Sequence, residues 1–329
     1  MVSEKGAELI LNSKNFFKRL FENKETGVII ALIVLIVFFS LTAENFLSSS
    51  NFINVARQVS IIAIMALGMT VVIIAGGIDL SVGSVMGLSG VFAAVLMMNY
   101  NLPVFVAGLG GVIVGGVLGL FNGTINAFFK VPSFIATLAM LSIARGIALL
   151  YTEAKPIYNL PDSFTNLGTG YVGHVPIPVI VMMLIFSLFY FLMRYTKIGR
   201  YAYSIGGNAD VARLSGINVR RYMISFFVIS GIMAGLAGVI LAARMASGEP
   251  TAGVGYELDV IAAVVLGGTS LAGGRGSMLG TMAGAFVMGV LSNGLAMLNV
   301  PPFVQMILSG LIILLAVGIG MRKSKEIVK

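Results

Sequence analysis

Long stretches without an acidic or basic residue are the clearest pattern in this chain. A helix that crosses the hydrocarbon core of a bilayer needs about 20 mostly apolar residues, and most of the stretches reach or approach that length. Two are long enough for a pair of crossings, and residues that favour a turn divide them at 99–103 and 299–302. The uncharged stretches cover residues 26–43, 59–78, 80–129, 131–144, 163–193, 222–243, 260–274 and 276–321.

Division at these turns predicts an all-α polytopic membrane protein with about ten membrane-spanning helices. All nine prolines then fall at the edge of a span or in a loop, where a missing backbone donor does least harm. An even number of crossings places both ends of the chain on one side of the membrane. The predicted spans are 27–43, 58–78, 80–98, 104–129, 133–151, 176–193, 222–243, 259–273, 277–298 and 303–321.

Composition supports this class of protein. Of 329 residues, 58% are hydrophobic and 10% are charged, and the mean hydropathy is +1.00. These values exclude an ordinary water-soluble chain. The chain has no cysteine and a single histidine, His174, so we expect neither thiol catalysis nor a cysteine- or histidine-based metal site.

The net charge of +8 would suggest nucleic-acid binding in a soluble protein, but here the positions of the basic residues indicate topology. With a cytoplasmic N-terminus, seventeen Lys and Arg residues fall inside; only Arg57, Lys155 and Arg244 fall outside, and Arg145 lies within a span. Such an excess is typical of cytoplasmic loops. The predicted parts are a cytoplasmic N-terminal segment (1–26), one transmembrane domain (27–321) and a cytoplasmic tail (322–329).

Glycines recur at a spacing of four, which places them on one face of a helix. Such faces let membrane helices approach closely, so we expect tight helix contacts there. The series are residues 111, 115, 119 and 123; residues 231 and 235; and residues 276, 280 and 284.

Two glycine- and serine-rich segments, GGIDLSVGS (76–84) and GGTSLAGGRGS (267–277), predict a break in a helix in each half of the chain. Their likeness leaves an internal duplication open as an explanation. Both segments also contain small polar residues that could face a pathway.

Two charged residues lie within the apolar part of the chain, where a charge costs about 2.5 to 3.5 kcal/mol on the insertion scale. Asp79 either caps a helix that begins at Leu80, by accepting backbone N–H groups, or acts in a pathway or gate. Arg145 either anchors the outer end of its span, in a structural ion pair or at the interface, or lines the pathway. Both alternatives stay open for each residue.

The sequence motifs that would indicate catalysis are missing or incomplete in this chain. It contains no GxxxxGK[ST] phosphate loop, so another subunit would have to supply ATP hydrolysis. Gly87 to Gly90 match the GxSG pattern of intramembrane serine proteases, but His174 lies outside every predicted span. We therefore predict that the chain is not an enzyme and has no catalytic residue.

A cytoplasmic segment, 194–221, alternates charges with apolar residues and predicts a short helix from about Asn208 to Leu214. Asn208 is a suitable N-cap, Asp210 suits the first turn, and Gly216 ends the helix. An apolar face on this helix indicates a docking surface, although packing against the chain itself is the alternative.

Four strings carry a resemblance to a known family: GGIDLSVGS (76–84), PSFIATLAM (132–140), IGRYAYSIGGNADVARLSGINV (198–219) and PTAGVGYELDVIAAVVLGGTSLAGGRGS (250–277). They resemble the permease subunits of bacterial ABC-type monosaccharide importers, and among these the ribose permeases are the most similar. The resemblance extends from about residue 27 to residue 320.

This resemblance implies the type II ABC importer permease fold in the bacterial plasma (inner) membrane, as a homodimer surrounded by lipid. It implies a cytoplasmic ATPase that binds ATP and Mg, an external or periplasmic sugar-binding protein, a monosaccharide substrate such as ribose, no cofactor on this chain and no nucleic acid. The residues that the resemblance assigns to ATPase coupling are Gly206, Gly207, Asn208, Ala212, Arg213, Leu214, Gly216 and Ile217. Residues 209–211 read Ala-Asp-Val where relatives usually have Glu-Ala-Ala, which displaces the carboxylate by one position.

A neutral sugar requires a path with modest hydrogen-bonding capacity. Hydrogen bonds between packed helices explain any one of the polar residues in the spans equally well. An ion-coupled secondary transporter of a small polar solute is the alternative function, which the scarcity of intramembrane carboxylates disfavours. The candidate pathway residues are Asp79, Ser84, Asn122, Asn126, Arg145, Thr269, Ser270 and Asn293, with Gln58, Ser60, Thr70, Ser292 and Gln305 as further lining groups.

Overall fold

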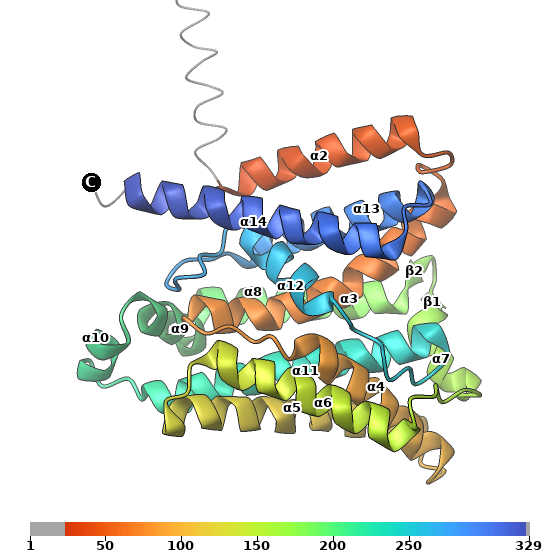
Figure 1. Ribbon diagram of the computed structural model, residues 1–329, viewed down its shortest axis with the longest axis horizontal. Helices are drawn as coiled ribbons and strands as arrows, with labels where there is room; N and C mark the ends of the chain where they lie inside the picture. The colour runs from red at the N-terminus through yellow and green to blue at the C-terminus, as the bar shows by residue number, and fades with distance from the viewer. Residues whose placement is uncertain (1–23, 327–329) are drawn as a thin grey trace, which may run out of the picture.

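A computed structural model describes residues 24–326, which form a bundle of helices (Figure 1). Strand structure in this range is limited to a hairpin of two short antiparallel strands, β1 (Tyr171–Val172) and β2 (Val175–Pro176). The helices are α2 (Lys24–Thr42), α3 (Ser49–Ile74), α4 (Val82–Met98), α5 (Val104–Phe129), α6 (Ser133–Thr152), α7 (Asp162–Thr169), α8 (Ile177–Tyr195), α9 (Lys197–Gly207), α10 (Ala209–Leu214), α11 (Val219–Met245), α12 (Tyr256–Leu266), α13 (Met278–Met297) and α14 (Pro302–Glu326).

Each of the ten predicted spans overlaps a helix, namely α2 to α6, α8 and α11 to α14. Within the described range, six helices are long and apolar enough to cross a membrane: α3, α5, α6, α8, α11 and α13. The protein is therefore helical and polytopic, and ten crossings stay a prediction.

The prediction of one membrane-spanning helix over 259–273 is wrong, because the helix in this region is shorter and begins earlier. Helix α12 has 11 residues, about 16 Å at 1.5 Å per residue, which is roughly half of a hydrocarbon core of about 30 Å. Non-helical chain precedes it at 246–255 and follows it at 267–277. Glycines 253, 255 and 268 have positive φ, and these backbone turns stop the helix at both ends.

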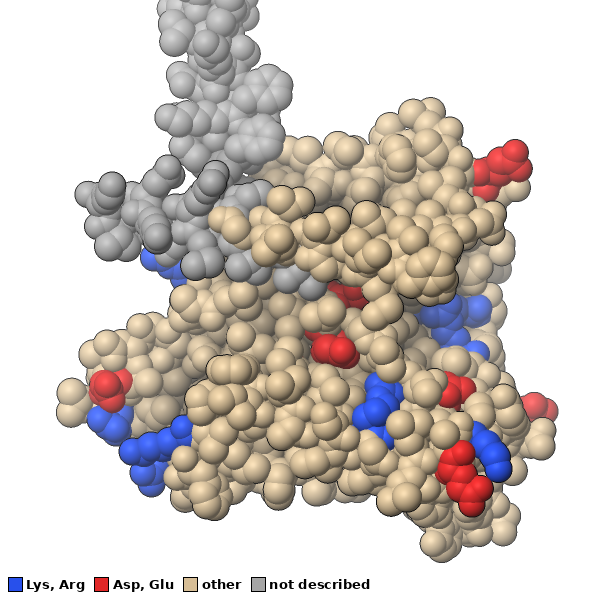
Figure 2. Space-filling view, in the orientation of Figure 1, with Lys and Arg blue, Asp and Glu red and all other residues tan. Residues whose placement is uncertain are grey.

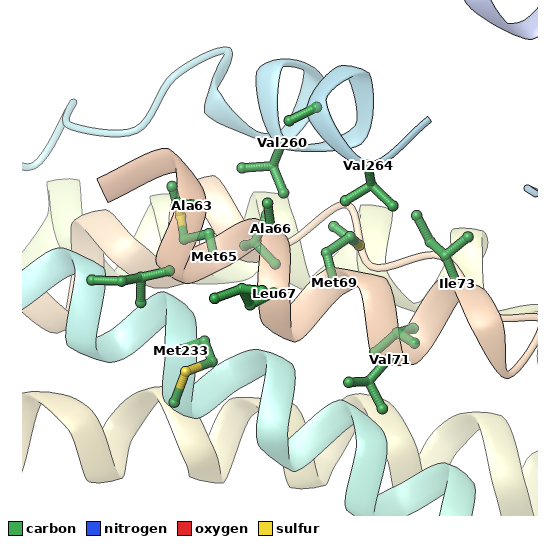
Figure 3. Packing of buried hydrophobic residues seen from close by; sticks show 14 of the residues in the cluster. Ala63, Met65, Ala66, Leu67, Met69, Val71, Ile73, Met233, Val260 and Val264 are labelled. Carbon is green, nitrogen blue, oxygen red and sulfur yellow. The ribbon is translucent and has the colours of Figure 1, made fainter. Parts of the chain in front are cut away.

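Helix α3 is the centre of the bundle. Every residue from Val59 to Ala75 is buried, which is the pattern of a helix that is apolar on all sides. Figure 3 shows Met233 of α11 against one side of α3, and Val260 and Val264 of α12 against the other. The short α12 is therefore held by the most buried element of the fold.

The glycine series in α5 forms a tight helix contact, as predicted, and the structure shows that its partner is α11. A Cβ on Gly115 would lie 2.9 Å from the Cα of Gly235, and a Cβ on Gly123 would lie 2.7 Å from the Cα of Ile224. Gly119 meets the backbone of Phe227 in the same way. In α13, Gly284 approaches the backbone of Ala263 in α12 equally closely, and Gly280 approaches that of Gly267, the residue that follows α12. These contacts leave no room for a side chain.

The two ends of the bundle differ in what they carry. One end of the bundle, which we call the α10 end, contains the start of α2, the helices α9 and α10, and the end of α14 (Figure 1). The opposite end, which we call the α7 end, contains α7, β1 and β2. Charged side chains gather towards both ends of the face in Figure 2, with a few acidic and basic groups in its middle. Most of the predicted N-terminal segment (1–26) lies outside the described residues. Of the predicted tail (322–329), residues 322–326 belong to α14, and residues 327–329 lie outside the described residues.

We expect Gly115→Ala to destabilise the protein, because the added methyl group would push α5 away from α11. Overpacking of this kind costs roughly 1 to 3 kcal/mol. Gly108→Ala on the same helix is the control, since its Cβ would meet Val239 at 3.6 Å, an ordinary contact. Thermal unfolding in detergent measures both variants; equal stability would mean that the α5–α11 contact is looser than described.

Candidate coupling and translocation site

The first break, between α3 and α4, is built around Asp79. One carboxylate oxygen, Oδ1, accepts the backbone N–H of Ser81 at 3.0 Å and its hydroxyl at 2.6 Å. The other, Oδ2, accepts the hydroxyl of Ser230 on α11 at 2.9 Å. Asp79 therefore fixes the turn before α4, which has Ser81 at its N-cap and begins at Val82, not at the predicted Leu80. The pathway alternative for Asp79 stays a prediction. The residue is 1% exposed, so its carboxylate faces protein in this conformation.

Helix α6 holds the same break from the other side. The backbone N–H of Ile78 donates to the Ser133 hydroxyl at 3.0 Å, and that of Leu80 donates to the Thr137 hydroxyl at 3.0 Å. Irregular backbone at membrane depth is tolerated only where its polar groups find protein partners. The PSFIATLAM segment thus supplies the acceptors that the GGIDLSVGS segment lacks.

The second break, between α12 and α13, lies directly on the first. The backbone N–H of Gly274 donates to the carbonyl oxygen of Ile74, the last residue of α3, at 2.8 Å. Four residues earlier on α3, the hydroxyls of Thr70 and Thr281 lie 2.7 Å apart. The structure therefore confirms two breaks and shows that they meet.

Arg145 on α6 anchors the chain that enters α12. Its Nη1 donates to the carbonyl oxygens of Pro250 at 2.6 Å and Ala252 at 2.8 Å. The anchoring interpretation fits these bonds, and the pathway alternative stays a prediction. The partners are backbone carbonyls, which a search for charged pairs along the sequence does not detect.

Two half-buried carboxylates at the start of α12 were missed by sequence reasoning. Glu257 and Asp259 are half-buried in the first turn of α12. The sequence had indicated Asp79 as the one acidic residue within the apolar part of the chain, and the structure adds these two, which are half-buried. The glycines at 253 and 255 are the available signal that α12 begins before Glu257.

The other predicted pathway residues do not gather in one cavity. The side-chain amide of Asn122 donates to the Ser81 hydroxyl at 2.9 Å. That of Asn126 donates to the Val131 carbonyl oxygen at 3.0 Å. That of Asn293 donates to the Asn51 amide oxygen at 3.0 Å. Ser84 and Thr269 are buried, and Ser270 is half-buried in the second break.

The further lining groups are placed in a similar way. Ser60 and Gln305 donate to nearby backbone carbonyls, Thr70 pairs with Thr281, and Gln58 and Ser292 are half-buried. A pathway role for any of these residues stays a prediction.

The segment 194–221 forms the short helix that its sequence predicts. Asn208 accepts the backbone N–H groups of Asp210 and Val211 at 3.0 Å each, and α10 follows. Asp210 pairs with Arg213 at 2.9 Å, an exposed pair that adds little stability. Gly216, with φ of +84°, ends the helix.

The outer face of α10 exposes apolar side chains at the α10 end. Leu214 is 85% exposed and Val211 is 57% exposed. Beside them lies a groove of about 260 Å³, lined by Ser204, Asn208, Val211, Ala212, Ser215 and Ile217. We call this face the docking surface. Gly207, Arg213 and Gly216 are also exposed, whereas Ala212 is buried and Ile217 is half-buried.

The geometry gives no support to a protease or a metal centre. Ser89 is fully buried in α4, and His174 is exposed in the turn between β1 and β2 at the opposite end from α10. Within residues 24–326, no group of three His, Cys, Asp or Glu residues could hold a metal ion.

Comparison with known proteins identifies the class to which this arrangement belongs. Residues 51–317 match the family described as "Branched-chain amino acid transport system / permease component". This range includes both breaks and the docking surface. The chain belongs to this permease family.

Three relatives are similar to the permease over most of both chains. The "Ribose import permease protein RbsC" of Haemophilus influenzae is 46% identical over 88% of this chain and 90% of its own. The proteins of that name from Escherichia coli and Bacillus subtilis are 44% and 43% identical, over 91% and 92% of this chain and 94% of their own.

We expect Asp79→Asn to retain folding and most transport, because the amide oxygen can still accept from Ser81 and the amide nitrogen can donate to Ser230. Asp79→Leu leaves these donors unsatisfied, at a cost of about 1 to 3 kcal/mol for a buried group, and should lower thermal stability. Thermal unfolding and uptake assays measure both variants. A well-folded Asp79→Asn protein without transport would show that the charge itself acts in the mechanism.

Proposed function

We propose that this protein is the membrane-spanning permease subunit of an ATP-driven, binding-protein-dependent importer that carries ribose or a related monosaccharide into the cell. The observation that carries the proposal is the 43–46% identity to ribose import permeases over 88–92% of the chain. The docking surface supports it, because neighbouring exposed apolar side chains such as Leu214 and Val211 are typical of a protein-binding surface.

The proposal divides the work among several chains. A cytoplasmic ATPase binds ATP and Mg and seats on the docking surface, and an external or periplasmic binding protein delivers the sugar at the α7 end. Two copies of the permease surround the path in the bacterial plasma (inner) membrane, with ten helices from each copy. Both termini are cytoplasmic.

We infer a sugar as the transported substrate from the similar ribose permeases, and not from the description of the family. The family model is described for branched-chain amino acids, whereas the three similar proteins are ribose permeases. Most of the polar side chains between the helices are hydroxyls and amides, and such groups can exchange hydrogen bonds with a neutral polyhydroxylated solute without holding it tightly.

Topology is tested by labelling single cysteines in this cysteine-free chain with an impermeant thiol reagent in intact cells. Ser163→Cys and Ser215→Cys are a matched pair, because both serines are exposed and they lie at opposite ends of the bundle. We expect labelling at 163 and none at 215 until the membrane is opened. The reverse pattern would invert the assigned orientation.

The function is tested by reconstituting the permease with its ATPase and binding protein in liposomes and measuring uptake of ribose, other pentoses and hexoses. Leu214→Asp places a charge on the docking surface and should reduce copurified ATPase and ATP-dependent uptake at least tenfold. Leu167→Asp on α7 is the control and should retain the ATPase. Uptake driven by an ion gradient without the ATPase would instead identify a secondary transporter.

A further inference from the structure

Helix α9 connects the docking surface to the interior of the bundle. It joins α10 at Asn208, and α10 packs chiefly against it. Its inner face is buried through Ala202 and Ile205. Helix α9 therefore provides the main contact between α10 and the rest of the bundle.

Tyr203 links α9 to the second break. Its hydroxyl donates to the carbonyl oxygen of Gly276 at 2.9 Å, two residues before α13 begins. Burial raises the pKa of the Tyr203 hydroxyl above its usual range, so the group stays protonated and able to donate.

Gly206 lies against both breaks at once. A Cβ at this position would overlap the carbonyl oxygen of Ile74 and lie 2.6 Å from the amide nitrogen of Gly274. These two groups form the hydrogen bond that joins the breaks. Gly206 thus packs on that bond and is not part of the exposed docking surface, which departs from the role that family resemblance gave it.

We propose that Tyr203 and Gly206 are positioning residues for transport, through which movement of the docked ATPase reaches the two helix breaks. This rests on the proposed function, in which α10 seats the ATPase. The glycines with positive φ at 76, 273 and 274 are the points where the backbone can change direction, because hinges absorb φ and ψ changes at such residues. One rigid contact therefore acts on α3 and α4 together with α12 and α13.

Tyr203→Phe tests the proposal with little risk to folding, since it removes one hydroxyl and keeps the ring. Tyr201→Phe is the matched control on the same helix: its ring packs edge-on against Tyr222 at 4.7 Å, and its hydroxyl has no hydrogen-bond partner within residues 24–326. In the reconstituted complex we expect Tyr203→Phe to keep its ATPase but to carry at least threefold less sugar per ATP hydrolysed. Tyr201→Phe should match the unmodified protein, and an unchanged ratio in Tyr203→Phe would overturn the proposal.

A second measurement separates this proposal from the identity of the cargo. Ala272 is exposed in the second break, and Ala272→Cys gives the chain a single thiol there. When a non-hydrolysable ATP analogue binds the permease–ATPase complex, the labelling rate at 272 should change, and Tyr203→Phe should reduce that change at least threefold. A change in labelling at 272 in a complex that takes up no sugar would refute the proposed cargo but would still support the contact through Tyr203. An equal response in Tyr203→Phe, or none in either protein, would refute the contact.

Gly206→Ala is the stronger perturbation of the same contact. Where it folds, it should reduce the response at 272 at least as much as Tyr203→Phe does. A folded Gly206→Ala protein with the full response would also overturn the proposal.

Discussion

Satisfaction of backbone hydrogen bonds away from water is the constraint on which the rest of this structure depends. The first helix break places backbone N–H groups in the interior, away from water, where only other protein groups can accept from them. The first break is satisfied by Ser133 and Thr137 on α6, and its carboxylate, Asp79, holds α4 and α11 together. The second uses the free carbonyl at the end of α3. Each break is therefore stable only because neighbouring helices are in place.

Close packing through glycine is what brings those helices near enough. At the α5–α11 contact the backbones meet without side chains between them, so the hydrogen-bonding hydroxyl of Ser230 and the amide of Asn122 reach the same break from different helices. Small residues and short polar side chains thus work together, because without the hydrophobic effect between helices, proximity and hydrogen bonds provide the cohesion.

Much of this arrangement could be predicted from the sequence, because it depends on local patterns. Uncharged length located the helices, Asn208 and Gly216 bounded α10, and four-residue spacing revealed the glycine faces. The contacts between distant segments could not be predicted in this way. Nothing local in PSFIATLAM shows that Ser133 will meet Ile78, and the shortness of α12 follows from glycine backbone turns that apolar composition conceals. Motif likeness placed Gly206 with its sequence neighbours in one coupling motif, but it could not show that Gly206 packs against Ile74 and Gly274 while Gly207 is exposed.

The exposed side chains of α10 also bear on how the complex is assembled in the cell. Leu214 and Val211 lie at an end of the bundle where, under the proposed orientation, water and not lipid surrounds them. Until a partner covers them, they form apolar surface of the kind from which aggregation begins. Under the proposed function, permease synthesised in excess over its ATPase would carry that surface uncovered, which favours balanced production of the two chains.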